Sequence, residues 1–168
     1  MPLCKRYQMK EAIDATVYEQ DCVGKAADLQ VFDMYKIKIE DLDFLGSFQL
    51  KIDSIGKVPC RNSNCDPNKR KRRCLVTAIV SWFHVQFRPT NSTFKLDLDT
   101  RPILKDNELT HWRQTVLNLE TPIEVREGDE LSGRLLVQQM EHEKRALNLK
   151  LGLRRNNGIE SIQQFKLR

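Results

Sequence analysis

The residue types that bind metal ions most readily gather in one stretch of the sequence. They occur in the order Cys60, Cys65, Cys74 and His84, with four, eight and nine residues between successive members. A zinc site needs four such ligands, but compact zinc modules place paired ligands two to four residues apart. The spacing here does not fit. We therefore expect no metal site, and interpret the four residues as two loop thiols, a strand cysteine and a packed histidine.

Five consecutive basic residues form the most highly charged run of the chain: Lys69, Arg70, Lys71, Arg72 and Arg73. Such a run is typical of a nuclear import signal, of a phosphate-binding patch, or of a solvated loop. Stacking on bases requires aromatic side chains, and residues 57–73 contain none. We rank the solvated loop first, nuclear import second and nucleic-acid binding third.

The net charge follows the same local pattern. The chain has 28 Lys and Arg against 23 Asp and Glu, a formal charge of +5, yet residues 57–73 alone hold seven basic residues and one acidic residue. The other residues together carry about −1. The basicity is therefore a loop inserted at 57–73 in a near-neutral domain, and an acidic partner for the whole surface is not indicated.

The sequence also bears on location. No run of about 18 apolar residues predicts a membrane span, and the N-terminal residues lack the apolar core of a secretory signal. The five cysteines are odd in number and irregularly spaced, which favours reduced thiols inside the cell. We expect the cytoplasm, the nucleus or both.

Catalytic motifs are scarce in this sequence. None of the seven glycines belongs to a GxGxxG loop, which argues against a nucleotide fold within the chain. Of the three histidines, His142 lies among charged residues and His84 in an apolar run, whereas His111 precedes Trp112 where a loop meets a predicted strand. Both of these side chains have an apolar body and a polar tip, so the pair could line a pocket. Simple packing is the alternative.

The elements that would position these residues are mostly strands. Apolar residues alternate with polar ones over 35–40, 48–53 and 147–153, which is typical of strands with one wet face. The run 74–87 is apolar on both faces and too long for an ordinary strand, so it must bend or bulge. Further strands are predicted at 94–98, 111–119, 131–139 and 159–166, with a strong hairpin signal at Asn156-Asn157-Gly158. We predict a mainly β fold, an antiparallel β-barrel or sandwich, and favour the barrel.

The N-terminal part has a different period. Met9, Ile13 and Val17 recur every four residues, which predicts a short amphipathic helix. We therefore divide the chain into a helical arm at 1–30 and a β-barrel domain at 31–168.

Four motifs resemble those of the protein arginine N-methyltransferases. Thr110–Val116 (THWRQTV) is similar to the Thr-His-Trp loop of that family, and the other three flank it in the family's order: Ile37–Phe44, Ser81–Phe87 and Pro122–Gly133. The likeness extends over about residues 1–165 and is interrupted by the basic insert. It points more to the asymmetrically dimethylating branch than to the symmetric one.

The resemblance implies roles for several residues. Thr110, His111 and Trp112 would support the substrate pocket, His111 by holding acidic groups of a catalytic loop and Trp112 by walling the arginine side chain. Residues 1–28 would be the dimerisation arm, in which Met9, Ile13 and Val17 dock onto a second subunit, of the same or another chain. Packing of this segment on its own barrel is the alternative.

The family's S-adenosyl-L-methionine domain and its loop with two glutamates have no counterpart in the sequence. We therefore expect that the chain binds no cofactor, contains no residue that touches the reacting atoms, and is inactive alone, since methyl transfer depends on positioning a bound donor. Two functions compete: the barrel part of an enzyme that methylates arginine-containing proteins, and a non-catalytic module that docks onto complete arginine methyltransferases. An unrelated barrel that binds nucleic acid is a distant third.

Overall fold

A computed structural model describes residues 9–53, 73–89, 93–103 and 111–168. Within them the chain forms nine strands and two short 3-10 helices, η1 (Glu19–Asp21) and η2 (Ile39–Leu42). The strands are β1 (Ile13–Ala15), β2 (Phe44–Lys51), β3 (Arg73–Ser81), β4 (His84–Phe87), β5 (Leu96–Asp99), β6 (Gln114–Arg126), β7 (Glu130–Gln139), β8 (Leu147–Arg155) and β9 (Ser161–Leu167). The prediction of a mainly β, antiparallel fold is confirmed.

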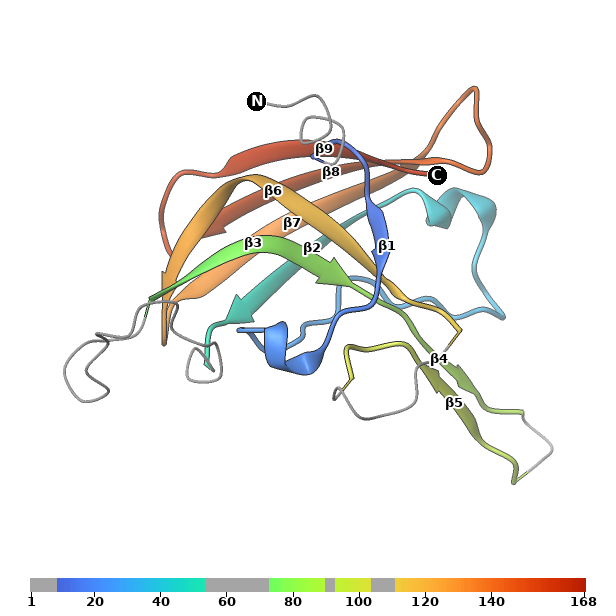
Figure 1. Cartoon of the computed structure of the whole chain (residues 1–168). Coiled ribbons are helices and arrows are strands. Elements are labelled where there is room, and N and C mark those ends of the chain that lie inside the picture. Colours follow the sequence, from blue (N-terminus) through green and yellow to red (C-terminus); the bar gives the residue numbers. More distant parts are fainter. Residues whose placement is uncertain (1–8, 54–72, 90–92, 104–110) are drawn as a thin grey trace.

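The strands form three antiparallel sheets, ordered β1-β6-β3, β2-β7-β8-β9 and β4-β5. Figure 1 shows the first two as curved layers that face each other, while the β4-β5 ribbon extends away from them. The core lies between the two larger sheets. Its buried side chains are Ile52, Val76, Leu117, Leu119, Val125, Leu131, Leu135, Val137, Leu149, Leu151, Leu153 and Phe165.

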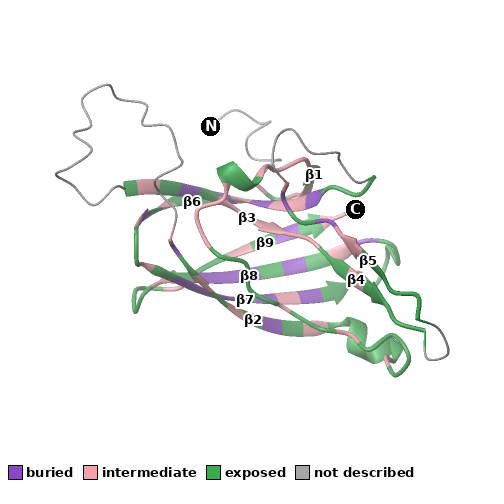
Figure 2. Cartoon of the chain, turned by 90° about the horizontal axis from the view of Figure 1, so that it is seen from below, coloured by how far each residue is buried: buried purple, intermediate pink, exposed green. Residues whose placement is uncertain are grey.

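The alternating leucines of β8 explain much of this core. Leu149, Leu151 and Leu153 point to one face because strand side chains alternate, and they pair with Val137, Leu135 and Gly133 of β7. Figure 2 shows the resulting alternation of buried and exposed residues along β7 and β8. Full burial of one leucine stabilises a fold by about 1.5–3 kcal/mol, so this pair of strands anchors the domain.

The apolar run 74–87 is bent, as its length predicts. The pairing of β3 with β6 shifts register between Val76 and Ala78, and the run is then interrupted at Trp82 and Phe83 before β4 begins. A bulge of this kind kinks the strand and increases its twist. The hairpin predicted at Asn156 is also present, since β8 and β9 pair directly and Asn156 adopts a φ of 49°.

The predicted barrel is wrong in one respect, because none of the sheets closes on itself. A closed barrel needs a continuous backbone ladder, but the N-terminal segment lies between β9 and β6. The Ala12 amide donates to the Lys166 carbonyl at 2.8 Å, and the Lys166 amide donates to the Lys10 carbonyl at 2.8 Å. Directly after Ala12, β1 pairs with β6. The segment therefore occupies the edges that closure would have joined.

The same pairing explains why the helix predicted over 9–17 is absent. Met9 lies in a turn, Ile13 in β1 and Val17 just after it, and all three side chains are half-buried. The spacing of four residues suits a helix, but the backbone groups of residues 10–15 are bonded to two sheet edges. Tertiary pairing thus overrides a weak local preference. Within one chain the segment packs on its own sheets, and docking of its half-exposed side chains onto a second subunit stays a prediction.

The strand predicted over 35–40 is also wrong. The Asp33 side chain accepts the Tyr35 amide at 3.1 Å, and the Asp41 side chain accepts the Lys38 amide at 3.0 Å. Such bonds from aspartate to nearby amides favour turns and helix starts over strands. The chain accordingly turns here and forms η2 before β2 begins.

Candidate functional site

The His111-Trp112 pair lies directly before β6 and beside the end of β3. The Trp112 ring meets the ring of Phe83 edge to face, with centroids 6.2 Å apart, and meets the ring of His111 at 5.6 Å. Edge-to-face contacts of this length are attractive. Trp112 nevertheless remains 50% exposed. We call these three residues the aromatic corner. Thr110 lies outside the described residues.

A hollow of about 140 Å³ adjoins this corner, lined by Thr16, Arg101, Ile103, His111, Trp112, Arg113 and Gln114. Its walls come from the N-terminal segment, from the end of β5 and from the start of β6. The hollow is small beside ligand pockets, which measure about 300–1,000 Å³. None of the described residues that line it has a carboxylate, so these residues by themselves do not hold a guanidinium.

Charge in the hollow is set by two arginines. Arg101 donates from its Nε to the Asp99 carboxylate at 2.6 Å, and this hydrogen bond holds the pKa of Asp99 below its usual value. The charge of Arg101 is thereby largely neutralised. Arg113 has no ion pair among the described residues. The hollow therefore has a cationic wall, which suits a carboxylate from outside the described residues.

Two buried polar residues lie beneath the corner. Gln114 is 4% exposed and Thr100 is 1% exposed. The Gln114 amide donates from Nε2 to the Thr100 carbonyl at 2.8 Å and accepts the Val17 amide at 2.7 Å. The Thr100 hydroxyl donates to the Phe83 carbonyl at 2.9 Å. The N-terminal segment, β5 and the corner are thus joined below the surface.

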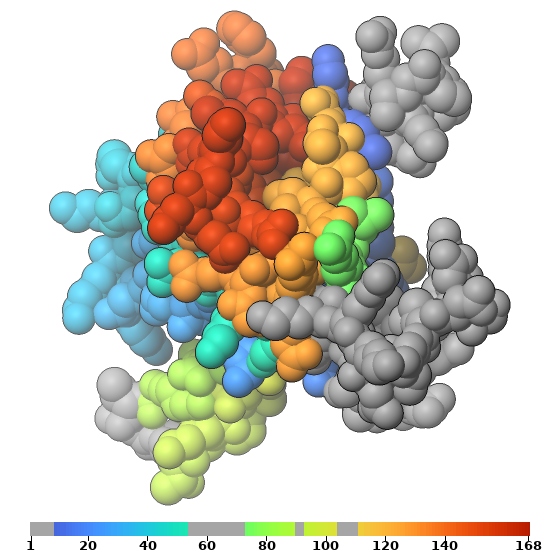
Figure 3. Space-filling view, turned by 90° about the vertical axis from the view of Figure 1, so that its left-hand side faces the viewer, coloured from blue at the N-terminus to red at the C-terminus, as the bar shows by residue number. Residues whose placement is uncertain are grey.

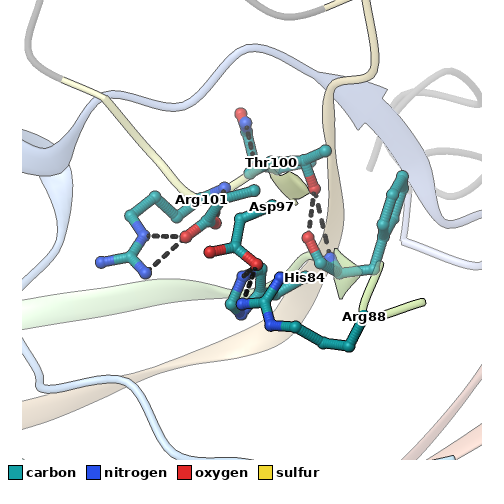
Figure 4. A network of polar contacts seen from close by, with 8 residues as sticks. His84, Arg88, Asp97, Thr100 and Arg101 are labelled. Carbon is teal, nitrogen blue, oxygen red and sulfur yellow. Dashed lines mark hydrogen bonds and ion pairs between the residues drawn. The ribbon is translucent and has the colours of Figure 1, made fainter. Parts of the chain in front are cut away.

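The β4-β5 ribbon has one polar and one apolar face. On the polar face Arg88 donates to the Asp97 carboxylate at 2.5 Å, and His84 lies 3.9 Å from the same oxygen. Figure 4 shows Arg88 and His84 both directed at Asp97, with Arg101 close by. This network keeps the carboxylate of Asp97 occupied and stiffens the ribbon.

The apolar face of the ribbon carries partly exposed side chains. Phe87 pairs with Leu96 across the ribbon, and each is 48% exposed; Phe94 is 61% exposed. No residue of β4 or β5 belongs to the core between the larger sheets. In Figure 3 the ribbon, drawn yellow-green, projects from the body of the molecule. Exposed apolar side chains are thus gathered on this face of the ribbon.

The cysteines and histidine considered as metal ligands are not brought together by the described structure. Cys74 lies in β3 and His84 in β4, while Cys60 and Cys65 lie outside the described residues. Burial raises the pKa of the Cys74 thiol, the opposite of what a thiolate ligand requires. No group of three or more potential ligands occurs in the part of the chain that the structure describes.

Of the basic run, only Arg73 is described, because residues 69–72 lie outside the described ranges. Arg73 begins β3 and pairs with Glu124 of β6 at 3.1 Å. It is therefore a strand residue whose charge has a partner.

Among the described helices, none is long and apolar enough to cross a membrane.

Sequence reasoning missed Thr100 and Gln114. Gln114 stands two residues after the tryptophan of the Thr-His-Trp motif, but no pattern in the sequence predicts its burial. Thr100 gives no sequence signal at all, because a single threonine after an alternating strand is unremarkable. Their importance depends on contacts across 14 and 17 residues of sequence.

Comparison with known protein families identifies the class of this domain. Residues 1–158 match the model of the arginine methyltransferase oligomerization subdomain. The chain belongs to that family, and the resemblance inferred from the Thr-His-Trp loop and its flanking motifs is confirmed.

Curated relatives agree with the family match. Protein arginine N-methyltransferase 8-B of Danio rerio is 29% identical over 148 residues, which cover 88% of this chain and 30% of the relative. Protein arginine N-methyltransferase 1 of Saccharomyces cerevisiae is 27% identical over 154 residues, covering 90% and 38%. The chain thus spans about a third of the length of these relatives.

Solved structures show the same fold. The Trypanosoma brucei PRMT1 enzyme–prozyme heterotetrameric complex with AdoHcy contains a chain that matches with a TM-score of 0.78 and 27% identity, over 98% of this chain and 46% of that one. Arabidopsis thaliana protein arginine methyltransferase 10 matches with a TM-score of 0.78 at 19% identity, over 96% and 44%. The second likeness concerns the fold alone.

Proposed function

We propose that this chain is the C-terminal portion of a protein arginine N-methyltransferase and forms one wall of its arginine pocket. The observation that carries the proposal is the half-exposed Trp112, held edge-on by Phe83 and His111 beside a cationic hollow. The face of an indole attracts a guanidinium. Trp112 would therefore lie against the substrate arginine.

The charge of the hollow supports a site in which another part of the enzyme supplies the groups that hold the substrate guanidinium. A guanidinium must be held by carboxylates in a bidentate fashion, and the hollow has Arg113 and His111 in its wall instead. These groups suit acidic side chains supplied by another part of the enzyme. We expect His111 to hold such a carboxylate by a hydrogen bond, so that the carboxylate in turn grips the substrate.

S-adenosyl-L-methionine is the methyl donor of this family, but the described residues do not fit it. Two hollows among the described residues, the one beside the corner and a second beside Arg134 and Glu160, measure about 140 and 200 Å³. Both are below the usual size of a cofactor site, and the sequence has no glycine-rich loop for a nucleotide. The donor would bind to another part of the enzyme. We therefore propose that the chain is inactive alone.

A reconstitution assay tests this proposal. The chain is incubated with isotope-labelled methyl donor and an arginine-rich peptide, first alone and then with a separately produced donor-binding portion of an arginine methyltransferase. We expect no methylated peptide from the chain alone and transfer in the mixture. Methylation by the chain alone contradicts the inactivity, and an inactive mixture whose parts co-elute contradicts the assignment of the pocket.

In the reconstituted enzyme, Trp112→Ala should lower kcat/KM by about fivefold, since a cation–π contact contributes on the order of 1 kcal/mol. Tyr35→Ala is the matched control, because Tyr35 is an aromatic residue that is 86% exposed and far from the corner in sequence. Equal losses in both variants would show that Trp112 has no particular role at the substrate.

The alternative function is a non-catalytic module that docks onto complete arginine methyltransferases. It is favoured by the uncovered apolar face of the ribbon around Phe87 and Leu96, and the trypanosomal neighbour is an enzyme–prozyme complex. The family's description as an oligomerization subdomain supports association in either case. If this alternative holds, adding the chain to a full-length arginine methyltransferase changes the rate of that enzyme and slows amide exchange in the ribbon.

Two further roles remain proposals. Met9, Ile13 and Val17 are half-buried and leave part of their surface for a subunit contact; replacing all three by serine should weaken association in sedimentation experiments. The run 69–73 is proposed as a nuclear import signal, and its deletion should lower the nuclear fraction of a fluorescently tagged chain. An unchanged fraction contradicts that role.

A further inference from the structure

We infer that Gln114 and Thr100 are positioning residues, which hold the aromatic corner in place and tie it to the N-terminal segment. The inference deepens the proposed function and rests on it for its catalytic consequence. Both would act indirectly, Thr100 through Phe83 and Gln114 through the backbone that follows Trp112.

Buried polar side chains are concentrated beneath the aromatic corner. Among the described residues only three polar side chains are buried: Thr100, Gln114 and Ser132. A buried polar group is costly unless its hydrogen bonds are made, and a satisfied network fixes one arrangement of the chain. Two of the three lie together beneath the corner, where the Gln114 side chain donates to the backbone carbonyl of Thr100. Such a concentration indicates a geometric requirement at this place.

The Gln114 side chain makes two hydrogen bonds. Its amide faces one donor and one acceptor, the Val17 amide at 2.7 Å and the Thr100 carbonyl at 2.8 Å. Only one orientation of the amide satisfies both, with Oε1 toward Val17 and Nε2 toward Thr100. Because Gln114 also pairs with Ala15 in the sheet, the start of β6 is held by the N-terminal segment through backbone and side chain together.

Thr100 is connected to Trp112 through Phe83. The Thr100 hydroxyl donates to the Phe83 carbonyl at 2.9 Å and accepts the Phe83 amide at 3.2 Å, while the Thr100 amide donates to the same carbonyl at 3.1 Å. The backbone of Phe83 is thus held at both of its polar groups. The Phe83 ring then contacts Trp112. Trp112 is fixed from two sides, through Phe83 and through Gln114.

Fluorescence of Trp112 tests the inference without any substrate. The chain has two tryptophans, so Trp82→Phe leaves Trp112 as the sole reporter. In that background Gln114→Met removes the amide at nearly constant length, and Thr100→Val removes the hydroxyl at constant shape. The observables are acrylamide quenching and the near-ultraviolet circular dichroism of the indole, with the far-ultraviolet spectrum as a check of folding.

We expect quenching to rise in both variants and the indole dichroism to weaken. Because Trp112 is already 50% exposed, release of the corner can at most about double the quenching constant. Thr100→Ser keeps the hydroxyl and should restore the parent signals. Ser132→Ala is the matched control, since it removes a buried hydroxyl in β7 that accepts Arg154 at 3.0 Å, away from the corner.

Unchanged quenching and dichroism in folded Thr100→Val overturn the inference, and so does an equal change in Ser132→Ala. If Gln114→Met does not fold, the Thr100 pair decides alone. Activity of the reconstituted enzyme separates the two hypotheses. A released corner with full activity contradicts the role of Trp112 at the substrate but leaves the positioning intact, whereas lost activity with an unchanged corner contradicts the positioning.

Discussion

At the scale of single residues, the chain uses side-chain carboxylates to organise turns as well as sites. Asp129 follows Gly128 in the β6–β7 turn and accepts hydrogen bonds from the Arg126 amide at 2.7 Å and the Asn156 side chain at 3.2 Å, while Arg155 forms an ion pair with it at 2.8 Å. Burial alone would raise the pKa of Asp129, but these hydrogen bonds and the charge of Arg155 prevail and lower it.

This depressed pKa predicts a dependence of stability on pH. A carboxyl whose pKa is lower in the folded chain stabilises the fold above the pKa of the unfolded state, and that contribution is lost as the pH falls through the folded value. We expect Asp129→Asn to cost about 1–2 kcal/mol at neutral pH and to flatten the acid limb of the stability curve, measured by urea unfolding between neutral and acidic pH.

Glu127→Gln is the matched control, because Glu127 is an exposed carboxylate in the same turn. It should leave the acid limb as steep as in the parent chain. An Asp129→Asn variant with the parent's pH dependence would show that the turn contacts contribute nothing to stability.

At the scale of elements, close packing across β2, β7 and β8 leaves no room at Gly133. A methyl group on Gly133 would lie 2.4 Å from the Phe48 ring and 2.8 Å from the Gly152 carbonyl. The ring can move only by disturbing its neighbours, and the carbonyl belongs to the β7-β8 ladder. The strand must therefore keep a glycine, for steric reasons and not for conformational freedom.

Gly133→Ala should accordingly destabilise the fold by about 1–3 kcal/mol, the usual cost of overpacking. Gln138→Ala on the same strand is the control, since Gln138 is exposed and its change should have little effect. Thermal and urea unfolding of the purified variants measure both. A stable Gly133→Ala chain would mean that Phe48 has an alternative position at little cost.

At the scale of the whole molecule, one side chain joins the two large sheets. Gln163 of β9 donates to the carbonyls of Met9 at 2.7 Å and Asn118 at 2.9 Å, and accepts the Glu120 amide at 3.0 Å. It therefore replaces, with one amide, the backbone ladder that a closed barrel would have between β9 and β6. The N-terminal segment is held at the same seam.

Gln163→Met leaves those three backbone groups unpaired, and each unsatisfied group costs about 1–3 kcal/mol unless water reaches it. We expect a loss of at least about 1 kcal/mol and faster hydrogen exchange at residues 10–15 and at Glu120. Gln164→Met on the opposite face of β9 is the control. If exchange at the seam is equal in both variants, the sheets are held together by the apolar core alone.

The sequence by itself determined the strand content, the bend in 74–87, the hairpin at Asn156 and the family. These depend on alternation, turn residues and local motifs, which are read within a few residues. It also placed His111 and Trp112 at the start of a strand. It could not show that Gln114 and Thr100 would be buried beneath them, because burial depends on residues distant in the chain.

Only the tertiary structure decided the form of the N-terminal segment and the openness of the sheets. The spacing of Met9, Ile13 and Val17 is compatible with a helix, and the preference between helix and strand is small for each residue. The free edges of β9 and β6 supply hydrogen-bond partners for residues 10–15, and these long-range bonds outweigh that preference. The segment predicted to be a helix is instead extended and lies in the seam between β9 and β6.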